Sequence, residues 1–138
     1  MTEKTFTMIK PDGVKKRITG EIISRIEKKG FEIEACIKKT LDLEEAKGLY
    51  SVHEGKPFFD SLVEFITSGP VILMVVSGDS VIEVIRKMMG ATDPKEALPG
   101  TIRGDFALEI GENIIHGSDS KESADREIAI FFPELISE

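Results

Sequence analysis

The sequence predicts an α+β domain built on a four-stranded antiparallel sheet, and three observations support that fold class. First, four segments are rich in β-branched or aromatic residues, as strands are, and they lie at residues 5–9, 31–41, 71–76 and 127–132. Second, residues 19–29 and 80–90 carry apolar residues at helical spacing between those strands. Third, residues 42–68 predict an inserted helical pair. The core elements then run βαββαβ, the order of a ferredoxin-like sheet with helices on one face.

The first strand and the first helix have clear ends. Residues 5–9 alternate and stop at Lys10-Pro11, because proline lacks the amide hydrogen that a central strand needs. Lys10 therefore lies at the mouth of the strand, where its side chain is either a site cation or simply solvated. The helix at residues 19–29 is amphipathic, and Gly30 is placed to end it.

Two of the predicted strands differ in how they are covered. In residues 31–41, Ile33, Ala35 and Ile37 alternate with charged residues, which indicates a strand with one face in water. Residues 71–76 are apolar throughout, which indicates a strand covered on both faces.

The helical pair begins with a capping signal. Asp42 and Glu45 resemble a capping box, which predicts a helix to about residue 52. Tyr50 falls near its end and is expected in the core. The positions expected to face inward are Leu43, Ala46 and Leu49.

Pro57 opens the second helix of the pair. Phe58 and Phe59 are adjacent and cannot both face the same core, so one of them is expected to be half exposed and available to stack on a base. The apolar positions of this helix are Phe58, Leu62, Phe65 and Ile66.

The C-terminal half combines one helix, a long loop and a last strand. Ser80 and Glu83 also resemble a capping box, and Arg86 falls off the apolar face of the helix that they open. The helix dipole also favours a cation there, so Arg86 has a structural explanation as well. Residues 91–111 lack periodicity, and loops of that length are usually functional or disordered. A short helix at residues 120–125 is expected before the last strand.

Composition indicates one ordinary globular domain over residues 1–138, with 41% hydrophobic and 31% charged residues. The net charge of −7 disfavours nucleic-acid binding as the main role, because a phosphate backbone is bound through many Lys and Arg contacts. A nucleotide would need cations gathered locally, for which Lys10, Arg86 and Arg103 are candidates.

Cysteine usage and hydropathy favour cytoplasmic residence. The single cysteine, Cys36, cannot form an internal disulfide, which fits a reducing compartment. Nothing at the N-terminus resembles a signal peptide, and the longest apolar run, residues 71–76, is too short to cross a bilayer. We therefore expect no membrane partner.

The strongest chemical signal is Asn-Ile-Ile-His-Gly-Ser-Asp-Ser at residues 113–120. Imidazole titrates near neutral pH, so a neutral ring nitrogen of His116 can attack an electrophile. Gly117 lets the backbone pass close to a ligand, and the polar residues after it can cap a helix or hold the ring. Taken alone, such a histidine is more often a loop residue with a satisfied hydrogen bond.

A histidine nucleophile can carry out phosphoryl transfer, which needs charge on the moving group to be neutralised. The chain has neither a Walker-type loop nor Gly-x-Gly-x-x-Gly after a strand, so a phosphate site must use side-chain cations. A histidine that carries the phosphoryl group lets the donor product leave before the acceptor enters, which gives ping-pong kinetics. A carboxylate on the other ring nitrogen would fix the tautomer, and Asp119, Glu122 and Glu127 are all near in the chain.

Four blocks resemble the nucleoside diphosphate kinase family, and they span nearly the whole chain in the family's order. They are the stretch at residues 113–120, Lys-Pro-Asp-Gly-Val at 10–14, Lys-Pro-Phe-Phe at 56–59 with Ser-Gly-Pro-Val at 68–71, and Pro-Gly-Thr-Ile-Arg-Gly-Asp-Phe at 99–106. The resemblance implies the same ferredoxin-like fold with an inserted helical pair. It also implies an enzyme that moves the terminal phosphate of a nucleoside triphosphate, typically ATP, to a nucleoside diphosphate.

The resemblance further implies a catalytic set. His116 would be the phosphorylated residue, oriented by Glu127 and Ser118. Tyr50 and Lys10 would stand close to the transferred phosphate.

The remaining implied residues hold the nucleotide. Lys10 and Asn113 would bind the ribose 3′-hydroxyl. The phosphates would be bound by Arg86, Thr92 and Arg103. The base would stack on Phe58, with Leu62 and Ile110 lining the cleft, and stacking tolerates every base.

The family also implies partners. Mg²⁺ would be bound mainly through the substrate phosphates, with few or no protein ligands. The chain would form a homo-oligomer, a tetramer or a hexamer. Two departures bear on these implications, because Val52 stands where the family often has a carboxylate, and the chain stops at Glu138, before the tails that brace subunit contacts in longer members.

Other readings of the same residues stay open. A nucleotide-binding or phosphohistidine-carrier module would keep the fold without turnover, although a binder has no need of a nucleophile. A phosphotransferase or mutase acting on sugar phosphates would also use His116, although Phe58 favours a base. A structural role in an assembly could be an additional activity.

Overall fold

The computed structural model describes residues 2–136 and contains, within them, a four-stranded antiparallel sheet. Its strands are β1 (Thr2–Ile9), β2 (Glu32–Lys39), β3 (Val71–Asp79) and β4 (Ile115–Gly117). Their spatial order is β2-β3-β1-β4, and each neighbouring pair is antiparallel. This is the ferredoxin-like arrangement, so the predicted fold class is confirmed.

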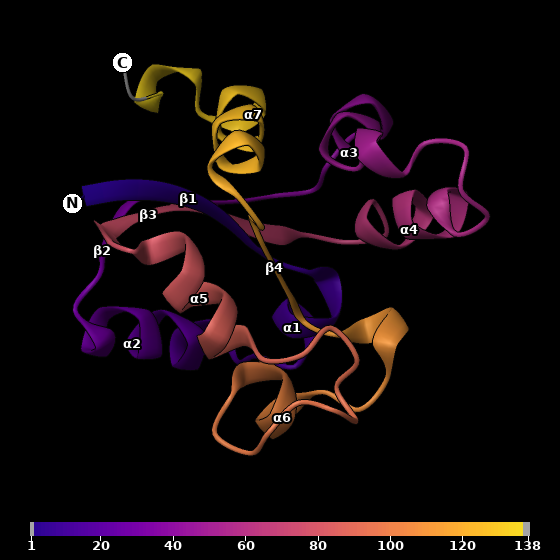
Figure 1. The fold of residues 1–138 in the computed structure, drawn as a ribbon. Coiled ribbons are helices and arrows are strands. Elements are labelled where there is room, and N and C mark those ends of the chain that lie inside the picture. Colours follow the sequence, from indigo (N-terminus) through magenta and orange to yellow (C-terminus); the bar gives the residue numbers. More distant parts are fainter. Residues whose placement is uncertain (1, 137–138) are drawn as a thin grey trace.

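Helices cover both faces of the sheet, not the one face expected (Figure 1). Alternate residues of β3 point into two separate apolar cores, starting with Val71 on one side and Ile72 on the other. The prediction that this strand is covered on both faces is therefore confirmed. The first core lies under α3 (Leu43–Leu49), α4 (Phe59–Ile66) and α7 (Lys121–Phe131), and the second lies under α2 (Thr19–Lys29) and α5 (Val81–Met89).

The C-terminal segment is the main correction to the predicted elements. Residues 127–132 belong to helix α7 and its end, and the fourth strand is β4, which contains His116. Ser120 caps α7 by accepting a hydrogen bond from the Ser123 amide at 3.1 Å. Glu127 and Ile128 are buried at helical spacing from Ala124, so the β-branched residues of this segment fill one stripe of a helix.

Strand β2 does not keep the predicted alternation. A register shift between Ile33 and Ala35 marks a β-bulge, which turns the strand about its axis. As a result Ile33 packs against the second core and Ala35 against the first, while Ile37 is 41% exposed. The single wet face expected for this strand is wrong.

The helical pair has the predicted start but a different phase. Asp42 and Glu45 form the capping box, with hydrogen bonds of 2.7 and 3.0 Å, although α3 ends at Leu49. Leu43 is 55% exposed, against expectation. In α4 the buried residues are Phe59, Val63 and Ile66. Ile66 faces inward as predicted, while the other two buried positions each lie one residue after a predicted one.

The second predicted capping box is absent. Ser80 has a positive φ of 55° and its side chain makes no capping hydrogen bond with α5. Strand β1 begins earlier than predicted, at Thr2, and so brings Glu3 to this helix. Oε1 of Glu3 accepts a hydrogen bond from the Ile82 amide at 3.1 Å, which supplies the cap from a distant part of the chain.

The long loop after α5 contains the short helices α6 (Ile102–Phe106) and η2 (Ile110–Glu112). Short helices elsewhere in the chain are α1 (Pro11–Lys15), η1 (Ser51–His53) and η3 (Pro133–Leu135).

Within residues 2–136 no helix is long and apolar enough to cross a membrane.

Candidate active site

His116 is the central residue of β4, and a buried carboxylate holds its imidazole. Nε2 lies 2.9 Å from Oε1 of Glu127, which also accepts a hydrogen bond from Ser118 Oγ at 2.8 Å. Because a carboxylate accepts, Nε2 carries the proton and Nδ1 keeps its lone pair. Nδ1 makes no hydrogen bond with any of residues 2–136, so it is the ring nitrogen available for attack. Of the three candidate carboxylates, Glu127 is the one that contacts the ring.

The backbone just before His116 is strained. Ile114 has a φ of 73°, a region that a β-branched residue rarely adopts. Its amide donates to Oδ2 of Asp12 at 2.9 Å, and its carbonyl accepts from the Lys10 amide at 2.7 Å. Both partners directly follow β1, so they fix the chain that leads into His116.

Sequence reasoning missed Asp12, which it treated only as a turn residue. The carboxyl is buried, and burial raises its pKa. Its contact with Ile114 spans 102 residues, and no local pattern in the sequence indicates it.

Gly117 has a packing function that the sequence did not indicate. The residue is buried, and a side chain there would clash with Met89 of α5. Glycine thus lets β4 lie close to α5. Gly117 also lines the cleft described below, so its predicted close approach to a ligand stays a prediction.

Lys10 and Asn113 form a buried polar pair beyond the end of β1. Nζ of Lys10 donates to Oδ1 of Asn113 at 2.8 Å, and Nδ2 of Asn113 donates to the Thr92 carbonyl at 2.9 Å. Burial, followed by the charge of Arg103, lowers the pKa of Lys10 to about 8. A poorly solvated ammonium of this kind is suited to an incoming anion.

The two arginines differ in how they are engaged. Arg103 is buried, and its Nε, Nη1 and Nη2 donate to the carbonyls of Asn113, Gly90 and Ile115. Burial and the charge of Arg86 lower the pKa of Arg103 to about 10. Arg103 therefore braces β4, and two of its five N–H groups remain for a ligand. Arg86 is exposed on α5, with one contact of 3.3 Å to the Gly117 carbonyl.

Tyr50 is buried in the first core, as predicted from spacing, and it also faces His116. Its ring lies edge-on to the His116 ring, with 5.9 Å between centroids. The hydroxyl is buried and has no hydrogen-bond partner among residues 2–136. Burial raises the pKa of Tyr50, so the hydroxyl stays protonated and able to donate to a ligand.

One cleft of about 750 Å³ collects these side chains. At one end Phe58 is 48% exposed while Phe59 is buried, which confirms that one of the two aromatics is half exposed. The ring of His53, another residue that sequence reasoning missed, lies 5.2 Å from the Phe58 ring. Ser118 lies behind Glu127 and does not line the cleft. The predicted residues that do are Lys10, Tyr50, Phe58, Leu62, Arg86, Thr92, Arg103, Ile110, Asn113, His116 and Glu127.

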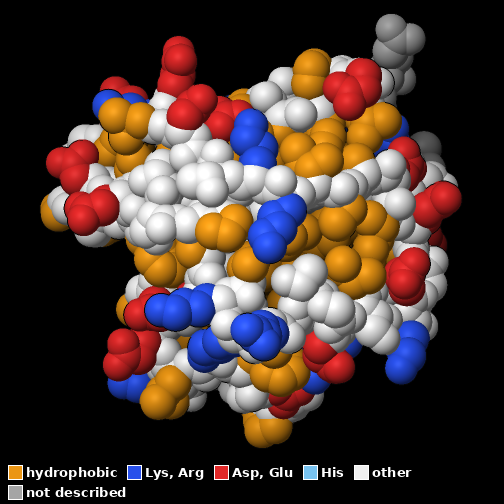
Figure 2. All heavy atoms as spheres, turned by 180° about the vertical axis from the view of Figure 1, so that it is seen from behind, with side chains coloured by type: hydrophobic (Ala, Val, Ile, Leu, Met, Phe, Trp, Pro, Cys, Tyr) orange, Lys and Arg blue, Asp and Glu red, His pale blue; other side chains and the backbone are white. Residues whose placement is uncertain are grey.

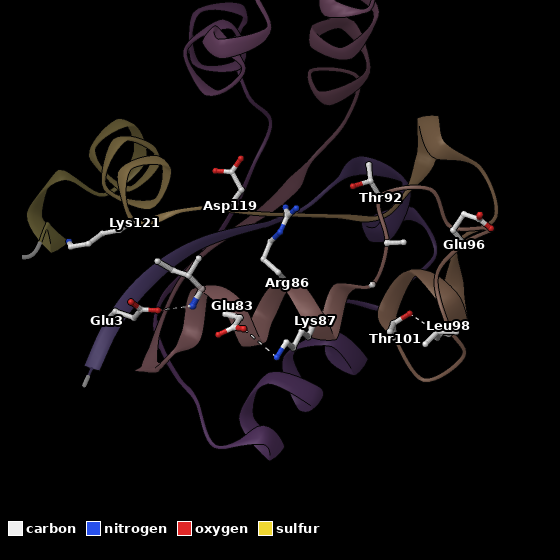
Figure 3. A pocket seen from close by; sticks show the side chains of 13 residues that line it. Glu3, Glu83, Arg86, Lys87, Thr92, Glu96, Leu98, Thr101, Asp119 and Lys121 are labelled. Atoms are coloured by element: carbon white, nitrogen blue, oxygen red, sulfur yellow. Dashed lines mark hydrogen bonds and ion pairs between the residues drawn. The ribbon is translucent and has the colours of Figure 1, made fainter.

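A second hollow of about 860 Å³ lies on the outer side of α5 (Figure 3). Arg86 lines both spaces and extends toward the side on which Asp119 and Thr92 lie. Hydrogen bonds from Ser123 and Ser120, and the charge of Arg86, lower the pKa of Asp119. Both spaces are lined by charges of both signs, but the buried cations Lys10 and Arg103 line only the first cleft.

The part of the chain that the structure describes contains no cluster of three or more His, Cys, Asp or Glu side chains able to hold a metal ion. A divalent cation at this site would need other ligands, such as phosphate oxygens.

The fold and the cleft define a nucleotide phosphotransferase, with an oriented histidine beside buried cations and an exposed aromatic ring. Residues 3–136 match the family model described as nucleoside diphosphate kinase. The chain belongs to the nucleoside diphosphate kinase family and is an enzyme of that family, as the sequence predicts.

Similar proteins agree with this family. The chain is 61% identical over 132 residues to a nucleoside diphosphate kinase of Hyperthermus butylicus, covering 96% of this chain and 93% of the relative. It is 59% identical over 133 residues to one of Thermobifida fusca, covering 96% and 98%.

Solved structures also match over nearly the whole chain. The nucleoside diphosphate kinase of Halobacterium salinarum in complex with CDP has a TM-score of 0.93 and 48% identity, covering 96% of this chain and 88% of that one. The Aquifex aeolicus nucleoside diphosphate kinase has a TM-score of 0.95 and 40% identity, covering 99% of each chain.

Proposed function

We propose that this enzyme transfers the terminal phosphate of a nucleoside triphosphate, typically ATP, to a nucleoside diphosphate through a phosphohistidine at His116. The observation that carries the proposal is the pairing of Nε2 with Glu127, which leaves the Nδ1 lone pair for the cleft. Nδ1 attacks the γ-phosphorus, the bond to the bridging oxygen breaks, and the nucleoside diphosphate leaves with that electron pair. The Nε2 proton stays on the ring, hydrogen-bonded to Glu127.

The second half-reaction reverses these bonds with a different diphosphate in the same cleft. A terminal oxygen of the acceptor attacks the phosphorus, and the electrons of the P–N bond return to Nδ1. One cleft serves both half-reactions, so the donor product leaves before the acceptor enters, and the kinetics are ping-pong.

The cations stabilise the charge that spreads over the moving phosphoryl group. Lys10 and Tyr50 serve at the transferred phosphate, and Lys10 with Asn113 binds the ribose 3′-hydroxyl. Arg86, Thr92 and the two free N–H groups of Arg103 bind the other phosphates. The burial of Lys10 and the unpaired hydroxyl of Tyr50 support these roles.

The base stacks on Phe58, between Leu62 and Ile110. This end of the cleft offers an exposed ring, which accepts any base because every base has a π-face. Broad use of nucleoside tri- and diphosphates follows, and the cytoplasm, where these nucleotides are made, is the proposed location. Mg²⁺ bound through the phosphates would neutralise their charge and fix their geometry, while Arg86 and Arg103 bind the phosphate oxygens that the ion does not contact.

We also propose that the chain forms a homo-oligomer, a tetramer or a hexamer, in which β2 pairs with a second copy. Figure 2 shows apolar side chains gathered on the back of the molecule, on the side where β2 and α2 lie. β2 is an edge strand with Ile37 exposed, and carboxylates at its start precede lysines at its end. Antiparallel self-pairing would set Glu32 near Lys38 of the copy. Sedimentation should show an assembly in the wild type and smaller species in Ile37→Lys, and a monomeric wild type would refute the pairing.

The phosphohistidine is tested with γ-labelled ATP and magnesium. We expect acid-labile label on His116 and, after GDP is added, labelled GTP. His116→Ala should lose both while still binding nucleotide, because only the nucleophile is removed. His53→Ala, which changes the other histidine in the cleft, should keep the label on His116.

Each other outcome has a distinct meaning. Label without transfer to GDP would indicate a phosphohistidine carrier, and no label would indicate a binding module. Transfer that persists in His116→Ala would rule out the covalent route.

A further inference from the structure

Arg126 connects two parts of the cleft that lie far apart in the sequence. It precedes Glu127 on α7, and its side chain is 32% exposed. Nη1 donates to the carbonyls of Gly48 and Leu49 at 3.0 and 3.3 Å, and Nη2 lies 3.4 Å from Oε2 of Glu127. One guanidinium thus bridges the end of α3 and the carboxylate that holds His116.

At α3 the guanidinium satisfies a helix terminus. The last carbonyls of a helix lack partners within it and carry partial negative charge, so a cation there is stabilising. Tyr50 directly follows these carbonyls and caps the helix. Arg126 therefore holds the end of α3, the first helix of the helical pair (α3 and α4), from which Tyr50 meets the His116 ring edge-on.

At Glu127 the guanidinium completes the set of contacts. Oε1 is occupied by His116 and Ser118, and Oε2 is occupied by Arg126. The charged or titratable groups that face this carboxylate are His116 from β4, Tyr50 from the end of α3 and Arg126 on its own helix. Only Arg126 among them carries a permanent positive charge, and its contact with Oε2 restricts the rotation of the carboxylate.

We propose that Arg126 is a positioning residue for phosphoryl transfer, which couples the placement of the helical pair to the carboxylate that orients His116. The inference rests on the proposed phosphohistidine mechanism. Arg126 lines the cleft, but the contacts that carry the proposal run to Glu127 and to the end of α3. A bound nucleotide that positions Phe58 and the helical pair thereby also positions the His116 ring, which attacks its terminal phosphate.

The test compares Arg126→Met and Arg126→Lys with the wild-type enzyme. Lys121→Met is the matched control, because Lys121 is an exposed cation of the same helix that pairs with Asp125 at 3.2 Å. Single-turnover phosphorylation of His116 by MgATP is followed at neutral pH, and MgADP affinity and melting temperature are measured in parallel.

We expect Arg126→Met to slow phosphorylation by about ten- to a hundredfold, the cost of a misplaced reacting group. MgADP affinity should also fall. Arg126→Lys should restore part of the rate but not the affinity, because one ammonium cannot span both contacts. Lys121→Met should resemble the wild type.

A lowered melting temperature with an unchanged phosphorylation rate and MgADP affinity per folded molecule would overturn the coupling and leave Arg126 a structural residue. Failure of the proposed function is recognised separately, because the wild type itself would then take no label on His116.

Discussion

Nucleotide affinity should fall as the pH rises from 7 to 9, because Lys10 is the phosphate-site cation that loses its proton most easily. The pKa of Lys10 is lowered to about 8 by burial and by Arg103. Roughly nine-tenths of the side chain is then protonated at pH 7 and roughly one-tenth at pH 9. Only the protonated form attracts phosphate, so the dissociation constant should rise about tenfold, or about 1.4 kcal/mol.

Titration calorimetry with MgADP checks this expectation. Run at pH 8.5 in two buffers of different ionisation enthalpy, it should show net proton uptake, because a bound phosphate raises the pKa of Lys10 again. Lys10→Arg stays charged over the whole range and should show a flat profile. An affinity that does not change from pH 7 to 9, or that falls equally in Lys10→Arg, would refute the assignment of this proton to Lys10.

The same proton has the opposite effect on folding. Because the pKa of Lys10 is about 8 in the folded chain and its ordinary value is 10.5, the unfolded chain binds the proton more tightly. The free energy of unfolding should therefore rise as the pH goes from 8 to 10.5, by about 3 kcal/mol relative to Lys10→Met. Urea denaturation measures this slope, which separates the titration of Lys10 from general damage at alkaline pH.

Substitutions at three positions test other parts of the structure. Phe58→Ala should weaken binding of ADP, GDP, CDP and UDP about equally, by about 1–3 kcal/mol in steady-state kinetics, and a loss confined to one base would contradict simple stacking. Asp12→Ala leaves the buried amide of Ile114 unpaired, so urea denaturation should show a loss of about 1–3 kcal/mol together with slower phosphorylation of His116. Asp12→Asn keeps an acceptor for the Ile114 amide. A loss of stability as large as that of Asp12→Ala would argue against a contribution from this hydrogen bond. Asp42→Ala removes the cap of α3 and should cost about 1 kcal/mol in the same assay without changing turnover at saturating nucleotide.

Local signals predicted most of the scaffold. The helix at Thr19–Lys29, the apolar strand from Val71 and the capping box at Asp42 depend on periodicity and on near neighbours, and each was predicted correctly. The fourth strand was misplaced, because the β-branched residues after Glu127 resemble a strand unless the cap at Ser120 is weighed. A three-residue strand such as β4 has too little sequence to show alternation.

The site shows a similar division. Family resemblance supplied its members, and the fold brings them together, but the sequence did not distinguish how each is used. In the sequence Arg86 and Arg103 were both scattered cations, yet Arg103 donates three of its N–H groups to backbone carbonyls. Asp12 and Arg126 were not recognised as parts of the site, since each makes a hydrogen bond to a residue more than seventy positions away in the sequence. Such contacts exist only once the chain has folded.

The helical pair enters the chain as one continuous insertion between β2 and β3, whereas His116 and its supporting residues come from β4 and α7. Changes within this single contiguous stretch can therefore alter the surface proposed to bind the base, provided that Tyr50, which faces His116, is kept. An engineer could exchange residues 43–66 between relatives to retune substrate preference, provided that Tyr50 and the carbonyls that accept from Arg126 keep their places.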